Sequence, residues 1–361
     1  MTDPSTDTAQ SRTTPAKHVP VLLAEVLAAL RPAAGEIYLD GTFGAGGYSR
    51  AILDGTICNV LALDRDPAAL AAAAPLIAQY SGRLRVVEAP FSTLDRVAQV
   101  YETPEGQPVG KVLVDGVVLD IGVSSMQLDQ AERGFSFQTD GPLDMRMSQG
   151  GRFAGPSAAD IVNTLDADDL ADIFYRLGDE KRSRQIARAI VMDRDAEPFT
   201  HTLQLADLVT RLLKTKKIDG RHAATRVFQA LRIYVNDELG ELVLALSAAE
   251  RVLKPGGRLV VVTFHSLEDA IVKRFFRART GRESKGSRHG PLNAGPQTPP
   301  SFQFVNHRPV NPSETEIARN PRSRSARLRS AVRTENAAWD LSAEDLAFPR
   351  LPGLAGRTKT L

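Results

Sequence analysis

Cysteine is nearly absent from this chain of 361 residues. The single thiol, Cys58, excludes a disulfide within the chain, and the six histidines are scattered without the spacing of a zinc site. We therefore expect neither a disulfide framework nor a bound metal. A reducing compartment suits such a composition, and we expect a cytoplasmic protein.

Long apolar runs are absent as well. No uninterrupted stretch approaches the roughly 18 residues that a membrane span needs, so we expect no membrane partner. Residues 1–15 are rich in Thr, Ser and Asp and lack the basic start and apolar centre of a signal peptide. We expect a disordered tail there. The remaining length suffices for one large domain with an insertion or for two modest domains.

The overall charge is also small, at +2, but its distribution along the chain is uneven. Between residues 271 and 334, fourteen basic side chains stand against three acidic ones. Such a surplus predicts a polyanionic partner such as RNA, and an arginine-rich surface in contact with water is the alternative interpretation.

Short β-branched runs alternate with Ala- and Leu-rich helical stretches, which predicts an α/β fold with a mainly parallel sheet. We expect helices at 49–53 and 67–80, among others. The alternation stops after Ile121 for about 100 residues, which is too long for a crossover connection. The expected strands are 37–40, 60–64, 84–88, 116–121 and 258–264, with a basic final strand at 326–334.

The interval after Ile121 has helical periodicity, so we expect a helical subdomain there. Asp166 is placed to cap a helix that Gly178 ends. The Gly-, Ser- and Pro-rich stretch 280–301 is typical of a loop. Further helices are expected at 180–192, 203–213 and 225–253, the last of them broken near Asn236.

A glycine-rich loop follows the first expected strand and precedes a helix. It runs from Asp40 to Gly47, so the backbone there can turn sharply against a ligand. Asp64 ends the next expected strand, where a carboxylate can accept hydrogen bonds from both hydroxyls of a ribose. Together the two features predict an adenosine-type cofactor.

Two cofactors and an ordinary turn compete as explanations of this loop. The NAD fingerprint is Gly-x-Gly-x-x-Gly facing a pyrophosphate, whereas here Gly44, Gly46 and Gly47 follow Asp40. A carboxylate in that place repels pyrophosphate but attracts the ammonium and sulfonium groups of S-adenosylmethionine. We favour S-adenosylmethionine over NAD, and a strand-to-helix turn with a capping aspartate is the structural alternative.

Two further side chains come directly after expected strands. Phe91 follows the third strand and could pack on adenine, although a single such ring is more often part of a core. Asp120 ends the fourth strand, at the edge where ligands of open α/β folds bind. A carboxylate in a valine-rich strand is costly without a partner, which favours a functional role for Asp120.

Several ordered segments of the chain together resemble a known family, the bacterial cytosine-N4 methyltransferases of 16S ribosomal RNA called MraW or RsmH. The resemblance extends from about residue 18 to residue 334. The matching segments are the loop that starts at Asp40 and residues 18–23, 63–66, 119–125, 132–137, 140–147, 225–233, 264–269 and 320–325.

The resemblance implies a Rossmann-like class I methyltransferase sheet with an inserted helical subdomain. The implied activity is S-adenosylmethionine-dependent methylation of the N4 amine of a cytosine in the decoding region of 16S rRNA, within the small ribosomal subunit. A homodimer stays open as the oligomeric state. The expected domains are the methyltransferase domain at 16–125 and 237–334, the inserted substrate-recognition subdomain at 126–236 and a C-terminal tail at 335–361.

The family's cofactor contacts carry over to Gly46, Gly47, Tyr48, Asp64, Phe91, Asp120 and Gln127. The chain departs from the family pattern in two places. Tyr48 replaces the histidine that usually follows the glycine pair, and residues 222–225 read His-Ala-Ala-Thr where His-Pro-Ala-Thr is usual.

The implied reaction needs hydrogen-bond acceptors, because the lone pair of the cytosine amine is delocalised into the ring. Acceptors orient the amine and take up the positive charge that forms on attack. Asp120 is the first catalytic candidate, with a role limited to the cofactor as an equal alternative, and His265 is the second. Amine-directed DNA methyltransferases have Pro-Pro-aromatic after this acid, whereas residues 121–123 here are Ile-Gly-Val.

Four arginines are candidate RNA contacts: Arg226, Arg232, Arg322 and Arg324. The first two lie about 240° apart around one expected helix, so they cannot form a single patch unaided. Two rival classes stay open, an NAD(P)-dependent oxidoreductase and a non-catalytic RNA-binding protein with a methyltransferase-like core. Binding of NADH would favour the first class, and failure to bind S-adenosylmethionine would favour the second.

Overall fold

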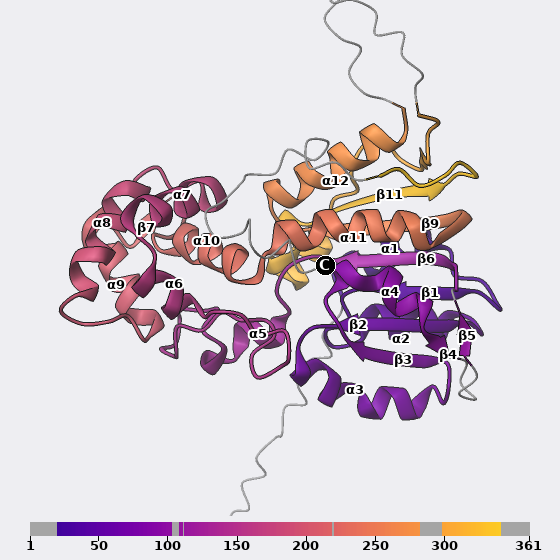
Figure 1. Ribbon diagram of the computed structural model, residues 1–361, viewed down its shortest axis with the longest axis horizontal. Coiled ribbons are helices and arrows are strands. Elements are labelled where there is room, and N and C mark those ends of the chain that lie inside the picture. Colours follow the sequence, from indigo (N-terminus) through magenta and orange to yellow (C-terminus); the bar gives the residue numbers. More distant parts are fainter. Residues whose placement is uncertain (1–19, 103–107, 111, 219, 282–297, 341–361) are drawn as a thin grey trace, which may run out of the picture.

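The computed structural model describes residues 20–102, 108–110, 112–218, 220–281 and 298–340. A seven-stranded sheet has the strand order β10-β11-β9-β6-β1-β2-β3 (Figure 1). Two short hairpins, β4 (Tyr101–Glu102) with β5 (Pro108–Gly110) and β7 (Lys217–Ile218) with β8 (Arg221–His222), are separate. The strands of the large sheet are β1 (Ile37–Asp40), β2 (Asn59–Asp64), β3 (Leu84–Glu88), β6 (Val114–Asp120), β9 (Leu253–Thr263), β10 (Phe302–Phe304) and β11 (Arg327–Arg333).

The five main strands expected from the sequence form the parallel part of this sheet. β1 pairs in parallel with β2 and β6, β2 pairs with β3, and β6 pairs with β9. The expected final strand is β11, which runs antiparallel to β9, and β10 extends the same edge without having been predicted. This arrangement confirms the predicted Rossmann-like α/β sheet.

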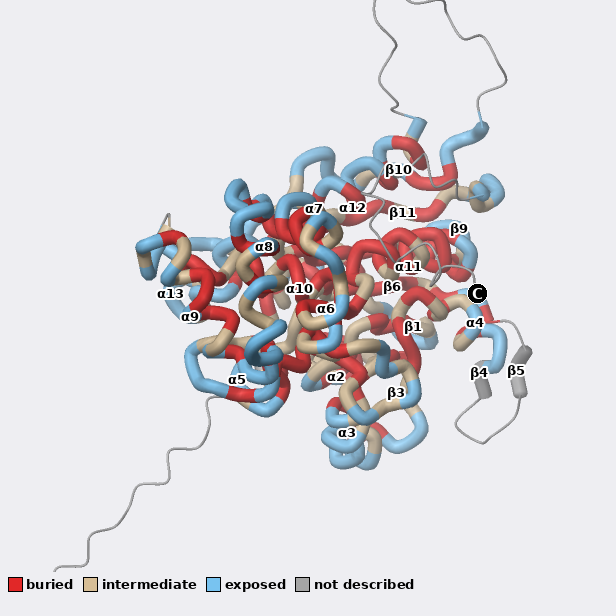
Figure 2. The backbone as a smooth tube through the Cα atoms, turned by 60° about the vertical axis from the view of Figure 1, so that its left-hand side comes forward, coloured by how far each residue is buried: buried red, intermediate tan, exposed pale blue. Residues whose placement is uncertain are grey.

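Helices cover both faces of the sheet, because successive side chains of a strand point to opposite sides. The neighbours Tyr38 and Leu39 accordingly belong to two different apolar cores. Figure 2 shows that the buried backbone follows β1, β6 and α11 through the molecule. One core contains α1 (Leu23–Leu30), α2 (Gly47–Gly55) and α3 (Pro67–Gln79), and the other contains α4 (Leu94–Gln99), α11 (Glu238–Val252) and α12 (Ser266–Arg279).

Four of the parallel strands end in an acidic residue at the same edge of the sheet. These residues are Asp40 in β1, Asp64 in β2, Glu88 in β3 and Asp120 in β6. Asp64 lies directly opposite Glu88 in the strand register. Ligands of open α/β sheets bind at this carboxyl edge, so the fold gathers carboxylates where a ligand is expected.

The chain between β6 and β9 is mainly helical and extends to the left of the sheet in Figure 1. Asp166 caps α7 by accepting a hydrogen bond from the amide of Asp169, as predicted. The expected break near Asn236 falls at Asp237, whose left-handed φ of 48° separates α10 from α11. The helices are α5 (Ser125–Asp129), α6 (Ala158–Thr164), α7 (Ala167–Gly178), α8 (Ser183–Arg194), α9 (Thr202–Leu213) and α10 (Thr225–Asn236).

Some predictions fall partly or wholly outside the described residues. These are the tail at 1–15, most of the loop expected at 280–301 and most of the tail expected at 335–361. Within the described parts of the chain, no helix is long and apolar enough to cross a membrane. The short elements η1 (Phe91–Thr93), η2 (Ala131–Arg133), α13 (Glu314–Arg319) and η3 (Pro321–Ser325) complete the fold.

Candidate active site

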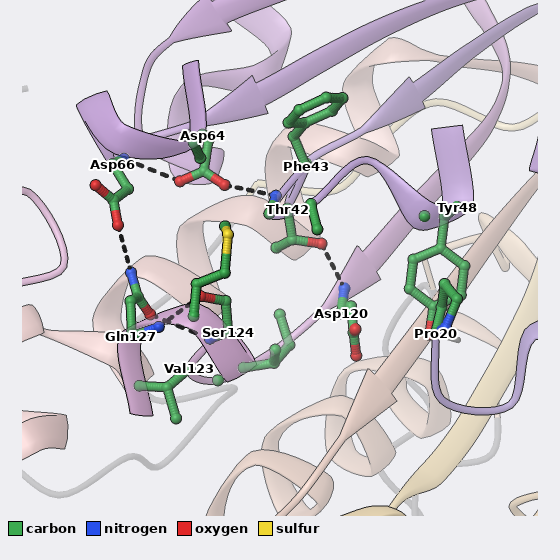
Figure 3. Close-up of a pocket in the computed structure, with 18 of the residues that line it drawn as sticks. Pro20, Thr42, Phe43, Tyr48, Asp64, Asp66, Asp120, Val123, Ser124 and Gln127 are labelled. Atoms are coloured by element: carbon green, nitrogen blue, oxygen red, sulfur yellow. Dashed lines mark hydrogen bonds between the residues drawn. The ribbon is translucent and has the colours of Figure 1, made fainter. Parts of the chain in front are cut away.

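A cavity of about 830 Å³ opens at the carboxyl edge of the sheet. Its walls come from the glycine-rich loop after β1, the end of β2, the start of η1, the end of β6 and the helix α5 (Figure 3). Six of the predicted cofactor contacts line it, namely Gly47, Tyr48, Asp64, Phe91, Asp120 and Gln127.

Gly46, the seventh predicted contact, does not line the cavity. It is buried with a left-handed φ of 74° and precedes α2 as its N-cap. A Cβ atom there would lie 2.7 Å from Leu76 and 2.8 Å from Phe43. Gly46 lets the loop turn and leaves room for the packing beneath it, while its neighbours Gly47 and Tyr48 line the cavity. Its direct contact with the cofactor stays a prediction.

Asp64 is held in place by backbone donors on both of its carboxylate oxygens. The amide of Gly44 donates to Oδ2 at 2.7 Å, and the amide of Asp66 donates to Oδ1 at 2.9 Å (Figure 3). Burial nevertheless raises the pKa of Asp64 above its usual value. Each oxygen keeps a second lone pair, so the carboxylate can still accept hydrogen bonds from a ligand in the cavity.

Asp40 is buried behind the loop and holds it from within. Its carboxylate accepts hydrogen bonds from the amide of Thr42 and from the hydroxyl of Ser49. Burial raises the pKa of Asp40 to about 6. The sequence placed this acid beside a ligand, whereas the structure makes it the anchor of the loop, with its charge close to the cavity floor.

Asp120 is held through its backbone amide, while one oxygen of its carboxyl group has no hydrogen-bond partner among the described residues. Its amide donates to Oγ1 of Thr42 at 2.7 Å, whereas its buried Oδ1 atom has no hydrogen-bond partner among the described residues. Burial and the charges of Asp40 and Glu268 raise the pKa of Asp120 to about 8, against a lowering contribution from Tyr48. A lone acceptor in a cavity lined by carboxylates fits a cationic ligand or a hydrogen-bond donor.

The remaining predicted cofactor contacts are fixed by their own packing. The hydroxyl of Tyr48 donates to the carbonyl of Val21, and its ring lines the cavity. Phe91 is half-buried at the start of η1. Gln127 forms a capping box with Ser124 at the start of α5. These contacts place the three side chains on the walls of the cavity.

His265 follows β9 at the carboxyl edge of the sheet, and its catalytic role stays a prediction. His265 caps α12, with Nδ1 accepting a hydrogen bond from the amide of Glu268, and its Nε2 lies 2.8 Å from Oε1 of Glu268. Its neighbour Phe264 lines the cavity, whereas His265 does not. His265 could touch a substrate at this edge only after turning away from Glu268.

Arg232 is also placed differently from the prediction that it contacts RNA. Its Nε and Nη2 atoms donate to the two oxygens of Glu238 at 2.7 and 2.8 Å, and its side chain is only 18% exposed. Atoms of Glu238, His265 and Glu268 lie within 4.8 Å of one another, a spacing compatible with a metal ion. The guanidinium of Arg232 lies on both oxygens of Glu238, and its positive charge opposes a second cation at this cluster.

The other predicted RNA contacts differ in their surroundings. Arg226 lies half-buried in the first turn of α10. Arg322 and Arg324 are exposed on η3. Nη2 of Arg322 is 2.6 Å from Oδ1 of Asp129, which lines the cavity, so η3 lies at the cavity mouth.

Several of the basic side chains between residues 271 and 334 form ion pairs within the protein and are not available to a polyanionic partner. Arg327 and Arg329 both pair with Asp269. Arg279 is fully buried against Glu250, and Arg333 is buried beside it. The sequence could not reveal these pairs, because Asp269 and Glu250 lie outside the counted segment.

Comparisons with known proteins show the family to which the chain belongs. A model of the family described as "MraW methylase family" matches residues 15–334. The chain belongs to this family. "Ribosomal RNA small subunit methyltransferase H" from Brucella suis is 55% identical over 347 residues, which cover 96% of each chain. The protein of the same name from Xanthobacter autotrophicus is 58% identical over 320 residues, covering 89% of this chain and 88% of its own.

Among solved structures, the N-methyltransferase NodS from Bradyrhizobium japonicum, in complex with S-adenosyl-L-homocysteine, is 8% identical with a TM-score of 0.37. The match covers 87% of this chain and 86% of that one. Membership of the MraW methylase family confirms the predicted class of enzyme and S-adenosylmethionine as its cofactor.

Proposed function

We propose that this protein transfers a methyl group from S-adenosylmethionine to the N4 amine of a cytosine in 16S rRNA, in the decoding region of the small ribosomal subunit. The relatives named for methylation of small-subunit rRNA support the substrate class. The observation that carries the proposal is the buried Oδ1 atom of Asp120, an acceptor without a partner at the edge of the cavity.

In this proposal the cavity holds the cofactor through residues that are already in place. Asp64 accepts hydrogen bonds from the ribose hydroxyls, and Phe91 packs on the adenine. Gln127 and the backbone of Gly47 complete the wall. When bound, the cofactor supplies an electrophilic methyl group on a positively charged sulfur.

Asp120 then has two tasks in catalysis. Its free oxygen accepts a hydrogen bond from the cytosine amine and so orients the nitrogen lone pair. The positive charge of the bound cofactor beside Asp120 favours the ionised form of this carboxyl group, whose pKa is otherwise raised to about 8. As the nitrogen forms its new bond to carbon, it gains positive charge, which the ionised carboxylate stabilises. The amine finally loses a proton, and the carboxylate of Asp120 is the acceptor within reach of this edge. His265 is the next candidate, because it lies at the same edge but is engaged with Glu268.

The exposed arginines of η3 provide the proposed contact with RNA. Arg322 and Arg324 lie at the mouth of the cavity, where phosphate groups flanking an extruded base would pass. Arg226 stays a candidate on α10. A substrate of this kind implies a cytoplasmic location, and a homodimer stays a prediction for the oligomeric state.

Mass spectrometry of nucleosides from 16S rRNA tests the proposal. We expect N4-methylated cytidine in rRNA from cells that carry the gene, and its loss from a deletion strain. Re-expression of the protein should restore the nucleoside. An unchanged content of N4-methylated cytidine after deletion would contradict the assignment, and loss of a different methylated nucleoside would redirect it.

A further inference from the structure

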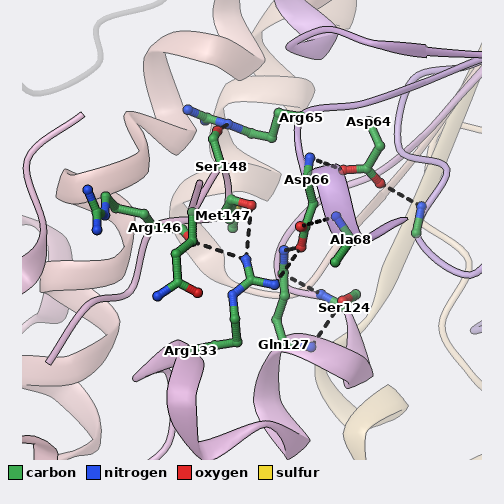
Figure 4. A network of polar contacts seen from close by, with 12 residues as sticks. Asp64, Arg65, Asp66, Ala68, Ser124, Gln127, Arg133, Arg146, Met147 and Ser148 are labelled. Carbon is green, nitrogen blue, oxygen red and sulfur yellow. Dashed lines mark hydrogen bonds and ion pairs between the residues drawn. The ribbon is translucent and has the colours of Figure 1, made fainter. Parts of the chain in front are cut away.

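A buried polar network joins the turn after β2 to the loop formed by residues 144–148, which belongs to the segment between β6 and β9 (Figure 4). Asp66 stands at its centre. The carboxylate of Asp66 accepts hydrogen bonds from the amide of Ala68, from Nε2 of Gln127 at 2.9 Å and from Nη1 of Arg133 at 2.8 Å. Its own amide donates to Asp64, so the network begins at the proposed ribose contact.

Arg133 carries the connection from Asp66 to the loop. While Nη1 binds Asp66, Nη2 donates to the carbonyls of Arg146 and Met147 at 3.1 and 3.0 Å. The side chain of Arg133 is 7% exposed, and that of Asp66 is 6% exposed. One planar guanidinium therefore fixes the distance between a wall of the cavity and the backbone of Met147, which also lines the cavity.

Arg65 holds the same loop from the other side. Its Nε donates to the hydroxyl of Ser148 at 2.7 Å, and its Nη1 donates to the carbonyl of Asn236 at 2.9 Å. Asn236 in turn accepts a hydrogen bond from the amide of Met147 and donates one to the carbonyl of Met145. The loop is thus bound both to the turn after β2 and to the end of α10.

The backbone of this loop is strained, which indicates that its position is imposed by its surroundings. Met145 has a left-handed φ of 61° and is fully buried. Such a conformation persists in a non-glycine residue only where neighbouring contacts determine it. Gly134, next to Arg133, has no room for a Cβ atom, which would lie 2.2 Å from the carbonyl oxygen of Pro142.

We propose that Arg133 is a positioning residue that couples the cofactor turn at Asp64–Asp66 to the loop 144–148, so that occupation of the cavity orders this loop, whose Met147 lines the cavity. This inference rests on the proposed location of the cofactor. Arginine is required because lysine cannot reach a carboxylate and two carbonyls at once with a rigid fork of donors. Lysine keeps the positive charge of Arg133 but not its three simultaneous hydrogen bonds, and the proposal attributes the coupling to these bonds.

Hydrogen exchange of the backbone amides in 141–148 measures this coupling directly. The probe is S-adenosylhomocysteine, which cannot react. In the wild-type protein, saturating probe should slow exchange in this segment at least threefold. In Arg133→Lys, with saturation verified by calorimetry, the probe should leave exchange in the segment unchanged.

Arg146→Lys is the matched control, because Arg146 belongs to the same loop but pairs with Asp144 and does not contact Asp66. It should keep the slowing seen in the wild-type protein. If Arg133→Lys fails to fold, Asp66→Asn replaces it in the test, because it removes the carboxylate that Arg133 binds. We expect the same loss of the response to the probe, and a wild-type response in Asp66→Asn would overturn the proposal.

Three results would overturn the proposal: no slowing in the wild-type protein, a wild-type response in Arg133→Lys, or failure of folded Arg133→Lys to bind the probe at all. The last would make Arg133 part of the binding contact itself. If Asp64→Ala binds the probe as tightly as the wild-type protein, the location of the cofactor is wrong, which is a separate failure.

Discussion

Asp64 connects the glycine-rich loop to the turn after β2, and it is also the proposed ligand of the ribose. We predict that Asp64→Ala weakens binding of S-adenosylmethionine by roughly 2–4 kcal/mol, because two charge-assisted hydrogen bonds are lost together. Isothermal titration calorimetry measures the change. Asp168→Ala, which removes an exposed acid on α7 that does not line the cavity, is the control and should bind with unchanged affinity. Equal affinities of Asp64→Ala and the wild-type protein would remove Asp64 from the site.

Asp120 gives the protein a pH dependence of known sign. Its pKa is raised from 3.8 to about 8, so the folded state holds this proton more tightly than the unfolded chain does. The stabilising contribution is therefore complete below about pH 4 and is lost as the pH rises through about 8. We predict that Asp120→Asn gains stability relative to the wild-type protein across this window, reaching a few kcal/mol at pH 8.

Chemical denaturation at a series of pH values between 4 and 8 checks this expectation. Asp129→Asn, which removes an exposed acid instead of a buried one, is the comparison variant. A difference between Asp120→Asn and the wild-type protein that does not change with pH would mean that Asp120 titrates normally in the folded state.

Much of the site at this level could be predicted from the sequence. Asp64 and Asp120 were found because each ends a β-branched run, and that pattern places them at the carboxyl edge whatever the surrounding packing. The roles of Asp66, Arg133 and Thr42 could not be found in the same way. Their partners lie tens of residues away in the chain, and only the folded structure brings them together.

The element η3 carries exposed arginines close to the cavity, because Arg322 pairs with Asp129 in the cavity wall. We predict that replacing Arg322 and Arg324 by glutamine reduces the log–log slope of RNA affinity against salt concentration by about 1.4–1.8, because each lost phosphate contact removes about 0.7–0.9. Affinity for rRNA fragments at several salt concentrations gives this slope. Replacement of Arg31, the exposed C-cap of α1, and of Arg96, which is exposed on α4, is the charge-matched control, since neither residue lines the cavity.

The control pair should keep the wild-type slope. If both double variants change the slope equally, overall charge governs the binding and η3 has no particular place in it. Arg327 is left out of the test because its guanidinium is paired with Asp269, so its removal would disturb the packing of β11 on α12.

Periodic patterns in the sequence predicted the helices and strands more reliably than the contacts that these elements make with distant parts of the chain. The strands, the cap at Asp166 and the break before α11 follow from local sequence, since β-branched runs and capping residues act within a few positions. The strand β10 has three residues and escaped detection, because its pairing with β11 depends on a partner about 30 residues away. The burial of Arg232 could not be predicted for a similar reason. Helical periodicity gives the direction of its side chain around the helix axis but does not show that Glu238 lies next to it.

In the molecule as a whole, the cavity lies where two parts of the chain meet. The glycine-rich loop and strand ends form one wall, and α5 with Met147 forms another. The segment between β6 and β9 leaves the sheet at Asp120 and returns through Asn236 and α11, so both of its connections lie beside the site. The domain boundaries predicted at residues 126 and 236 stay a prediction, but this path explains how one cavity can serve both cofactor and base.

The catalytic role of Asp120 is the central claim, and a single-turnover assay tests it most directly. The substrate is the small ribosomal subunit from a deletion strain, and S-adenosylmethionine is kept at saturation. We predict that Asp120→Asn, which preserves shape but removes the charge, lowers the rate of methyl transfer at least a hundredfold, about 2.7 kcal/mol in the barrier. A wild-type rate at saturating cofactor would contradict the claim and make Asp120 a cofactor ligand only.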